Sequence, residues 1–168
     1  MTDRSDEAMK EPPDPGGSVA STIGSFLTDL ECTACTARFG ADEPLGVCPA
    51  CGKVLFARYD LHGLRRAMPT PDFSGRPWDL WRYRELLPIR EQRHAVSLGE
   101  GATPLIPLPQ RALMAAGLPA AEVLLKDEGA NPTGSFKARG LSVAVARAAE
   151  LGVEHVALPS AGNAGAAA

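Results

Sequence analysis

The chain has 168 residues, and its 17 lysines and arginines stand against 20 aspartates and glutamates, which gives a formal net charge of −3. This balance excludes a broad basic surface for nonspecific nucleic-acid binding, so we expect no nucleic-acid partner. Hydrophobic residues make up 45% of the sequence, enough for a packed core. No apolar run reaches the roughly 18 residues that a membrane-spanning helix needs, so we expect no membrane association.

Residues 1–25 are polar and centre on the run Pro12-Pro13-Asp14-Pro15-Gly16-Gly17. Such a composition buries too little apolar surface to offset the entropy lost on ordering, so we predict a disordered tail. The tail also lacks the apolar stretch of a secretory signal, which makes a cytoplasmic protein the expectation.

All four cysteines of the chain form one C-x2-C-x12-C-x2-C array: Cys32, Cys35, Cys48 and Cys51. Two close pairs allow four thiolates to surround one zinc ion, and the flanking apolar residues suit short strands. We therefore predict a structural, zinc-ribbon-like module over residues 26–57. Unligated or disulfide-bonded cysteines and an iron–sulfur centre are the alternatives. Disulfides are uncommon in a cytosolic protein, and the spacings of common clusters are absent.

Residues 58–97 are expected to form a linker with one short helix near residues 78–87. Trp78, Trp81 and Glu85 lie there at near-helical spacing. An aromatic stripe of this kind favours packing over the stacking of nucleic-acid bases.

Residues 98–168 alternate between apolar runs and helical patterns. The predicted elements are an edge strand at 105–108, a helix at 109–117, a strand at 123–126, a helix at 135–151, a strand at 153–158 and a further helix after the loop at 160–163. Two strands joined by a helical crossover are parallel. The fold class is therefore expected to be α/β, with the metal module followed by an incomplete parallel-sheet domain.

The stretch from Gly129 to Gly140 reads G-A-N-P-T-G-S-F-K-A-R-G, with a turn-forming centre. Thr133 or Ser135 is expected to cap the following helix, which places Lys137 in its first turn. The partial positive charge at a helix N-terminus disfavours an ammonium group and suits a neutral amine that attacks an aldehyde. The alternative is a surface lysine that bends into water.

The second loop contains Ser160, Ala161, Gly162 and Asn163. Small residues let backbone amides approach a carboxylate, and the Asn163 amide suits a ring oxygen. A capped turn with Ser160 or Asn163 as N-cap explains this loop equally well. Because both loops leave the carboxyl ends of predicted parallel strands, we expect Lys137 and this loop to be neighbours.

Four segments together resemble the threonine synthase family, which uses pyridoxal phosphate and has the tryptophan-synthase-β-like, type II fold. They are N-P-T-G-S-F-K, S-A-G-N-A-G-A-A, W-R-Y-x-x-L-L-P and G-E-G-x-T-P-L. The resemblance implies that Lys137 holds the cofactor, that Asn163 contacts its ring hydroxyl, and that the second loop holds the carboxylate of a small amino-acid substrate. The implied reaction converts O-phospho-L-homoserine and water to L-threonine and phosphate.

Ala138 departs from this family, whose members usually have an aspartate after the lysine. A non-acidic residue occurs there in threonine dehydratases, so a threonine or serine dehydratase of the same fold stays open. A zinc-ribbon interaction module without catalysis is the alternative from another class. The sequence stops inside a helical pattern at Gly165 to Ala168 without a stop signal. We therefore expect the N-terminal part of a longer protein, inactive alone, whose complete form leaves homo-oligomerisation open.

Overall fold

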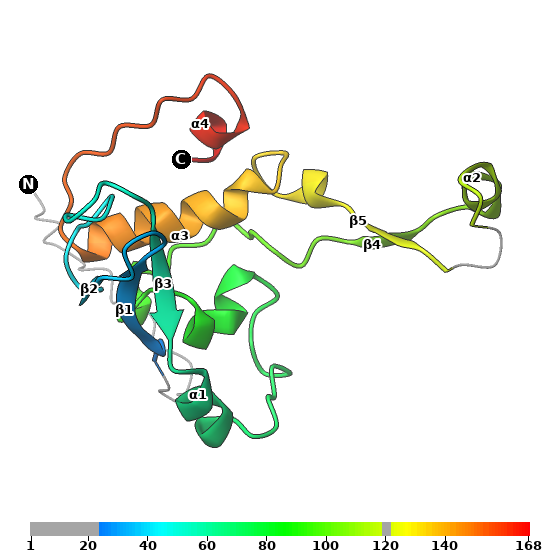
Figure 1. Cartoon of the computed structure of the whole chain (residues 1–168). Coiled ribbons are helices and arrows are strands. Elements are labelled where there is room, and N and C mark those ends of the chain that lie inside the picture. Colours follow the sequence, from blue (N-terminus) through cyan, green and yellow to red (C-terminus); the bar gives the residue numbers. More distant parts are fainter. Residues whose placement is uncertain (1–23, 119–121) are drawn as a thin grey trace, which may run out of the picture.

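The computed structural model describes residues 24–118 and 122–168. Apart from residues 24 and 25, the predicted disordered tail lies outside these ranges. The chain begins with a small antiparallel sheet in the order β2-β1-β3, formed by β1 (Leu27–Cys32), β2 (Arg38–Gly40) and β3 (Leu55–Tyr59) (Figure 1). The strands come from the segment that carries the cysteines.

Three short helices follow the sheet: α1 (Leu61–Ala67) and the 3₁₀ helices η1 (Leu80–Leu86) and η2 (Gln92–His94). The helix predicted near residues 78–87 is present as η1. The Asp79 carboxylate caps it by accepting from the Trp81 backbone N–H at 2.9 Å. Non-helical backbone angles at Tyr83 interrupt η1, so it does not continue as a regular α-helix.

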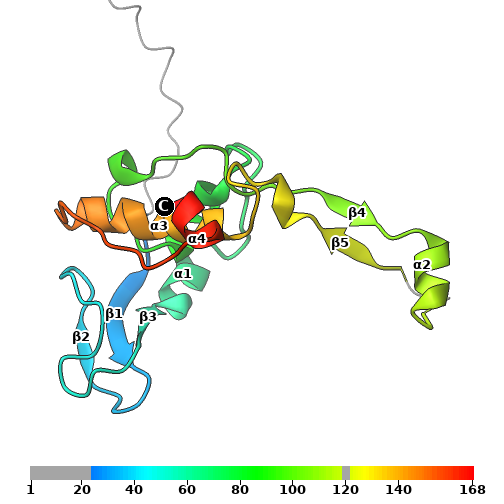
Figure 2. The same ribbon diagram turned by 90° about the horizontal axis from the view of Figure 1, so that it is seen from above.

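The long helix α3 (Lys137–Glu150) lies at the centre of the molecule (Figures 1 and 2). Ala146 of α3 packs with Trp81 and Ile89 in the buried core. The Trp81 indole nitrogen also donates to the Val96 carbonyl at 2.9 Å, so its one polar atom is satisfied. This core fixes the segment after the first sheet against α3.

Helix α3 ends as its sequence predicts. Gly152 has a φ of +71° and donates to the Ala149 carbonyl, while Val153 donates to the Ala148 carbonyl. This pair of bonds is the Schellman motif, in which glycine adopts the left-handed conformation at little cost. The short helix α4 (Asn163–Ala167) then lies beside α3. Within the described ranges no helix is long and apolar enough to cross a membrane.

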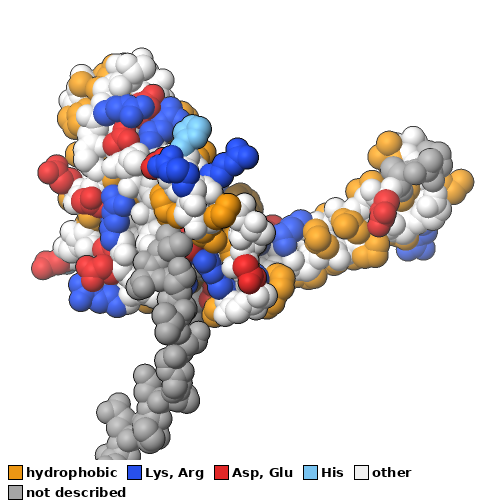
Figure 3. Space-filling model, turned by 90° about the horizontal axis from the view of Figure 1, so that it is seen from below, with side chains coloured by type: hydrophobic (Ala, Val, Ile, Leu, Met, Phe, Trp, Pro, Cys, Tyr) orange, Lys and Arg blue, Asp and Glu red, His pale blue; other side chains and the backbone are white. Residues whose placement is uncertain are grey.

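An arm projects from the body and consists of β4 (Leu105–Pro107), β5 (Leu124–Lys126) and α2 (Gln110–Ala115) at its tip (Figure 1). Strands β4 and β5 pair in antiparallel fashion, with Ile106 opposite Leu125. Every residue of both strands is exposed, and hydrophobic side chains follow the arm along its length (Figure 3).

The predicted parallel sheet is not formed. All strand pairs among the described residues are antiparallel, and residues 153–158 form no strand. A strand needs a partner for its backbone N–H and carbonyl groups. Strand β5 finds that partner in β4, with α2 between them in sequence, and the 153–158 segment has none within the described ranges. The mixed α/β character holds, but the sheets are small.

Candidate functional site

The four cysteines converge at one end of the first sheet. Their sulfur atoms all lie within 4.8 Å of one another, and none forms a disulfide. Cys32 and Cys48 are buried, with 1% of each residue exposed, while Cys35 and Cys51 lie at the surface. A metal ion among these four sulfur atoms would be partly shielded from water.

Both cysteine pairs sit in turns of the same construction. The Thr36 backbone N–H donates to the Cys32 carbonyl, and the Gly52 N–H donates to the Cys48 carbonyl in the equivalent position. Thr36 and Gly52 have φ values of +60° and +70°, so each turn closes through a left-handed residue. Each turn thus directs two sulfur atoms toward the other pair.

The sulfur geometry fits a tetrahedral metal ion. Sulfur–sulfur distances are 3.4 Å for Cys32–Cys51 and 3.6 Å for both Cys35–Cys48 and Cys35–Cys51. Four ligands at about 2.3 Å from a zinc ion would stand about 3.8 Å apart. Backbone N–H groups of Cys35 and Ala34 hydrogen bond to the Cys32 sulfur and lower its pKa to about 6, which favours the thiolate that a metal requires.

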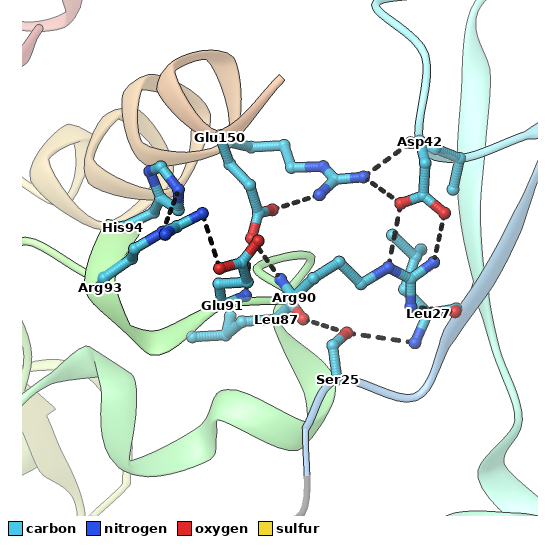
Figure 4. A network of polar contacts seen from close by, with 11 residues as sticks. Ser25, Leu27, Asp42, Leu87, Arg90, Glu91, Arg93, His94 and Glu150 are labelled. Atoms are coloured by element: carbon cyan, nitrogen blue, oxygen red, sulfur yellow. Dashed lines mark hydrogen bonds and ion pairs between the residues drawn. The ribbon is translucent and has the colours of Figure 1, made fainter. Parts of the chain in front are cut away.

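The loop between the two cysteine pairs is tied to α3 by charge (Figure 4). The Asp42 carboxylate accepts from Arg90 at 3.0 Å and from Arg147 of α3 at 2.6 Å. Arg147 also donates to the Ala41 carbonyl and pairs with Glu150. These contacts join the cysteine-bearing module directly to the helix that begins at Lys137.

Lys137 is the first residue of α3 and is half-buried. The loop before it forms the predicted turn, in which the Gly134 N–H donates to the Asn131 carbonyl at 2.8 Å and Gly134 has a φ of +70°. Pro132 takes the second position of this turn, where its fixed φ is favourable. Local sequence therefore places the lysine at the mouth of a tight loop.

The expected helix caps are not made. Phe136 occupies the N-cap position without a side-chain bond. The hydroxyls of Thr133 and Ser135 are instead buried, and neither has a hydrogen-bond partner among the described residues. Unpaired buried hydroxyls are costly and call for a polar partner. Their position immediately before Lys137 leaves hydrogen-bonding capacity there for a polar ligand.

Lys137 and Lys126 have different surroundings. In the described part of the chain no ion pair involves Lys137, and its ammonium nitrogen lies 4.6 Å from the centre of the Phe136 ring. Lys126 donates from Nζ to the Thr103 carbonyl at 2.6 Å. The acidic residues after Lys126 do not form an ion pair with it, because Glu128 binds Arg139 instead.

Sequence reasoning missed the scaffold that holds this loop. Glu128 makes two bonds to the Arg139 guanidinium, at 2.6 and 2.7 Å, and accepts from the Thr103 hydroxyl at 2.6 Å. Asn131 donates to Glu128 and accepts from the Gly101 backbone N–H. Bonds from Arg139 and Thr103 lower the Glu128 pKa to about 2. The available signal in the sequence was Arg139, two positions after the lysine. It therefore lies on another face of the helix, where it can hold the loop.

The second predicted loop lies at the surface. Ser160, Ala161, Gly162 and Asn163 are all exposed. The Ser160 hydroxyl accepts from the backbone N–H groups of Gly162 and Gly165, at 3.3 and 3.1 Å, so it serves the turn as a capping group would. Helix α4 brings this loop toward α3, but among the described residues no hydrogen bond joins it to Lys137.

Residues 96–168 match the family model "Pyridoxal-phosphate dependent enzyme". The chain is 40% identical over 132 residues to a threonine synthase of Methanocaldococcus jannaschii, covering 79% of this chain and 32% of the relative. It is 36% identical over 138 residues to a threonine synthase of Methanosarcina acetivorans, covering 82% and 32%. A threonine synthase of Halalkalibacterium halodurans is 48% identical over 89 residues, which cover 53% of this chain and 24% of the relative.

No solved structure matches the chain. The chain spans about a third of the length of the first two relatives. Their match confirms the resemblance read from the lysine and asparagine loops. The chain thus resembles the N-terminal part of threonine synthases, and its residues 96–168 are similar to the pyridoxal-phosphate dependent enzymes.

Proposed function

We propose that the protein carrying this chain is a threonine synthase-like lyase that converts O-phospho-L-homoserine and water to L-threonine and phosphate. The similarity to threonine synthases supports this reaction class. The substrate in this proposal is a small amino acid, and pyridoxal phosphate is the cofactor. Because the chain covers a third of its relatives, the activity is assigned to the whole protein.

The observation that carries the proposal is the surroundings of Lys137. Its amine has no carboxylate partner in the described ranges, lies against the Phe136 ring and begins a helix. An amine that no carboxylate occupies is available to attack the aldehyde of a cofactor. The unpaired hydroxyls of Thr133 and Ser135 add hydrogen-bonding capacity beside it. We propose that Lys137 holds the cofactor covalently.

Each remaining residue of the site has a role in this proposal. Pyridoxal phosphate, when bound, supplies an electron sink for removal of protons next to the amino group. The Lys137 amine would hold and move protons at the α and β carbons of the substrate. Asn163 would contact the ring oxygen of the cofactor, and the backbone N–H groups of Ser160, Ala161 and Gly162 would hold the substrate carboxylate.

We further propose that the cysteine cluster binds one zinc ion as a structural, zinc-ribbon-like module over residues 26–57. The nearly tetrahedral sulfur spacing supports a closed site with four protein ligands. Such a site leaves no position for a reacting water. The metal would therefore stabilise the loop that carries Asp42 rather than take part in the reaction.

Borohydride reduction of the cofactor-loaded, full-length protein, followed by peptide mapping, tests the assignment. The pyridoxyl mass should appear on the peptide that contains Lys137. Lys137→Ala should abolish turnover, whereas Lys126→Ala should keep the label on Lys137. A label on another lysine, or near-normal turnover of Lys137→Ala, would contradict the mechanism. Absence of any label would favour a metal-binding interaction module instead.

A threonine or serine dehydratase of the same fold is the second candidate. Ala138 favours it, because this position is not acidic and only 1% of the residue is exposed. Product analysis separates the two reactions. Release of phosphate from O-phospho-L-homoserine supports the synthase, and release of ammonia from threonine or serine supports the dehydratase.

A further inference from the structure

A cavity of about 300 Å³ lies at the base of the arm. Its lining includes three cationic side chains, Arg82 of η1, Lys126 of β5 and Arg139 of α3, with the Trp78 and Tyr83 rings beside them. Lys137 and the Ser160–Asn163 loop do not line it. We propose that this cavity binds a small metabolite through an oxyanion, either a carboxylate or a phosphate group. This site is separate from the proposed catalytic site.

Arg82 is the central observation. Only 7% of this residue is exposed, yet its guanidinium has no carboxylate partner among the described residues. One nitrogen donates to the Phe73 carbonyl at 3.0 Å, while Nε and Nη1 are buried without any hydrogen-bond partner. An arginine stays charged at every physiological pH. A buried, uncompensated cation of this kind attracts an anion.

Glu85, three positions after Arg82, is already paired with other arginines. Glu85 is occupied by a two-bond contact with Arg76, at 2.7 and 2.8 Å, and by a weaker pair with Arg84. The Arg82 guanidinium instead lies 3.8 Å from the centre of the Trp78 ring. Cation–π stacking covers one face of the guanidinium but supplies no negative charge to its N–H groups.

The charge around the cavity remains positive after its acidic residues are counted. Asp79 lines the cavity and caps η1, and Glu128 lies behind Arg139. Three cations therefore face two carboxylates. Lys126 uses one of its three N–H groups on the Thr103 carbonyl and keeps two for a ligand.

The cavity volume and its aromatic edge define the ligand class. A space of about 300 Å³ is at the lower end of cavities that hold small metabolites. Trp78 has 74% of its surface exposed at this edge, which offers an apolar ring surface next to the charged floor. The geometry suits a small organic acid or phosphate ester better than a large polyanion.

Binding can be measured by calorimetry and tryptophan fluorescence, with inorganic phosphate and with acetate as separate probes. The chain has two tryptophans, and Trp78 is the exposed one. We expect saturable binding of at least one probe, weakened at high salt, with a fluorescence change that is lost in Trp78→Phe. Binding of phosphate alone indicates a phosphate-bearing ligand, and binding of acetate alone indicates a carboxylate-bearing one.

Lys126→Met should weaken binding at least tenfold, because it removes the most exposed of the three charges. Arg66→Met, on the exposed end of α1, should leave binding within twofold. Lys137→Ala should also leave the affinity measured by Trp78 fluorescence within twofold. This result would separate the site from the proposed catalytic lysine. Absence of saturable binding, or equal affinity in Lys126→Met and Arg66→Met, would overturn the proposal. Arg82→Lys tests the central residue with its charge retained, and its two lost N–H donors should weaken binding severalfold.

Discussion

Arg147 of α3 donates to Asp42 at 2.6 Å, although 105 positions separate the two residues in sequence. Asp42 lies in the loop between the two cysteine pairs, and Arg147 lies on the helix that begins with Lys137. Arg90 approaches the same carboxylate from the segment between them (Figure 4). One carboxylate thus connects the cysteine-bearing module, the intervening segment and the central helix.

The two partners of this contact should contribute unequally to stability. Arg147 has 11% of its side chain exposed and Asp42 has 63%. Asp42→Ala should lower the free energy of unfolding by about 1 kcal/mol, because water screens much of the Asp42 charge and Arg147 retains its ion pair with Glu150. Arg147→Ala should cost about 3 kcal/mol, because it leaves the buried Glu150 carboxylate without its cation. Urea denaturation of both variants measures the difference, and equal losses would contradict the asymmetry.

The cysteine cluster should bind about one zinc ion per chain after treatment with reductant, as measured by elemental analysis. Cys48→Ser should reduce this to near zero, because three thiolates no longer close the site. The Ala50→Ser variant, at an exposed position in the same turn, should retain the metal.

Hydrogen exchange should report where the loss of metal acts. We expect β1, β2 and β3 to lose protection in Cys48→Ser while α3 keeps most of its protection, because folding of such turns is coupled to the metal. Full zinc occupancy in Cys48→Ser would refute the four-cysteine site.

The unpaired hydroxyl of Thr133 and the paired hydroxyl of Thr103 allow a matched comparison. Thr133→Val should change the free energy of unfolding of the cofactor-free protein by less than about 0.5 kcal/mol, since no bond is lost. Thr103→Val should cost about 2 kcal/mol, because its hydroxyl donates to Glu128 and accepts from Arg139.

The affinity for the cofactor should respond to Thr133→Val even though the stability of the cofactor-free protein does not. Thr133→Val should weaken pyridoxal phosphate binding about tenfold, if its hydroxyl serves the cofactor as proposed, which corresponds to roughly 1.4 kcal/mol. Unchanged affinity in Thr133→Val would remove this hydroxyl from the proposed cofactor site.

Glu128 should make stability depend on pH. Its pKa falls from 4.5 to about 2 in the folded protein, mainly through its bonds to Arg139, with a further contribution from Thr103. The folded state therefore binds fewer protons than the unfolded state. The stabilisation is complete above pH 4.5 and is lost as the pH falls toward 2.

Glu128→Gln tests this dependence. At pH 7 the free energy of unfolding of the variant should be lower by about 2 kcal/mol. This value allows for solvent screening of the ion pair, because 26% of the Glu128 side chain is exposed. At pH 3 the difference from the unsubstituted protein should fall to about half or less. The exposed Glu154→Gln variant should show no such dependence. A constant difference between pH 7 and pH 3 would exclude the ion pair as its source.

Local sequence was sufficient for the features that a few neighbouring residues decide. The two C-x2-C turns fix the positions of their own sulfur atoms, and the predicted cluster is present. Pro132 and Gly134 set the turn before Lys137, and Gly152 ends α3. These predictions succeeded because backbone preferences and ligand spacing act over three to six residues.

Tertiary structure alone decided which distant groups meet. The sequence offers many arginines and carboxylates of similar character, so it could not show that Arg147 selects Asp42 or that Glu128 selects Arg139 rather than Lys126. It also predicted a parallel partner for β5, whereas β4 pairs with that strand in antiparallel fashion. Pairing free energy depends on the distance between groups and on how much water is excluded from each contact, and both quantities exist only in the folded chain.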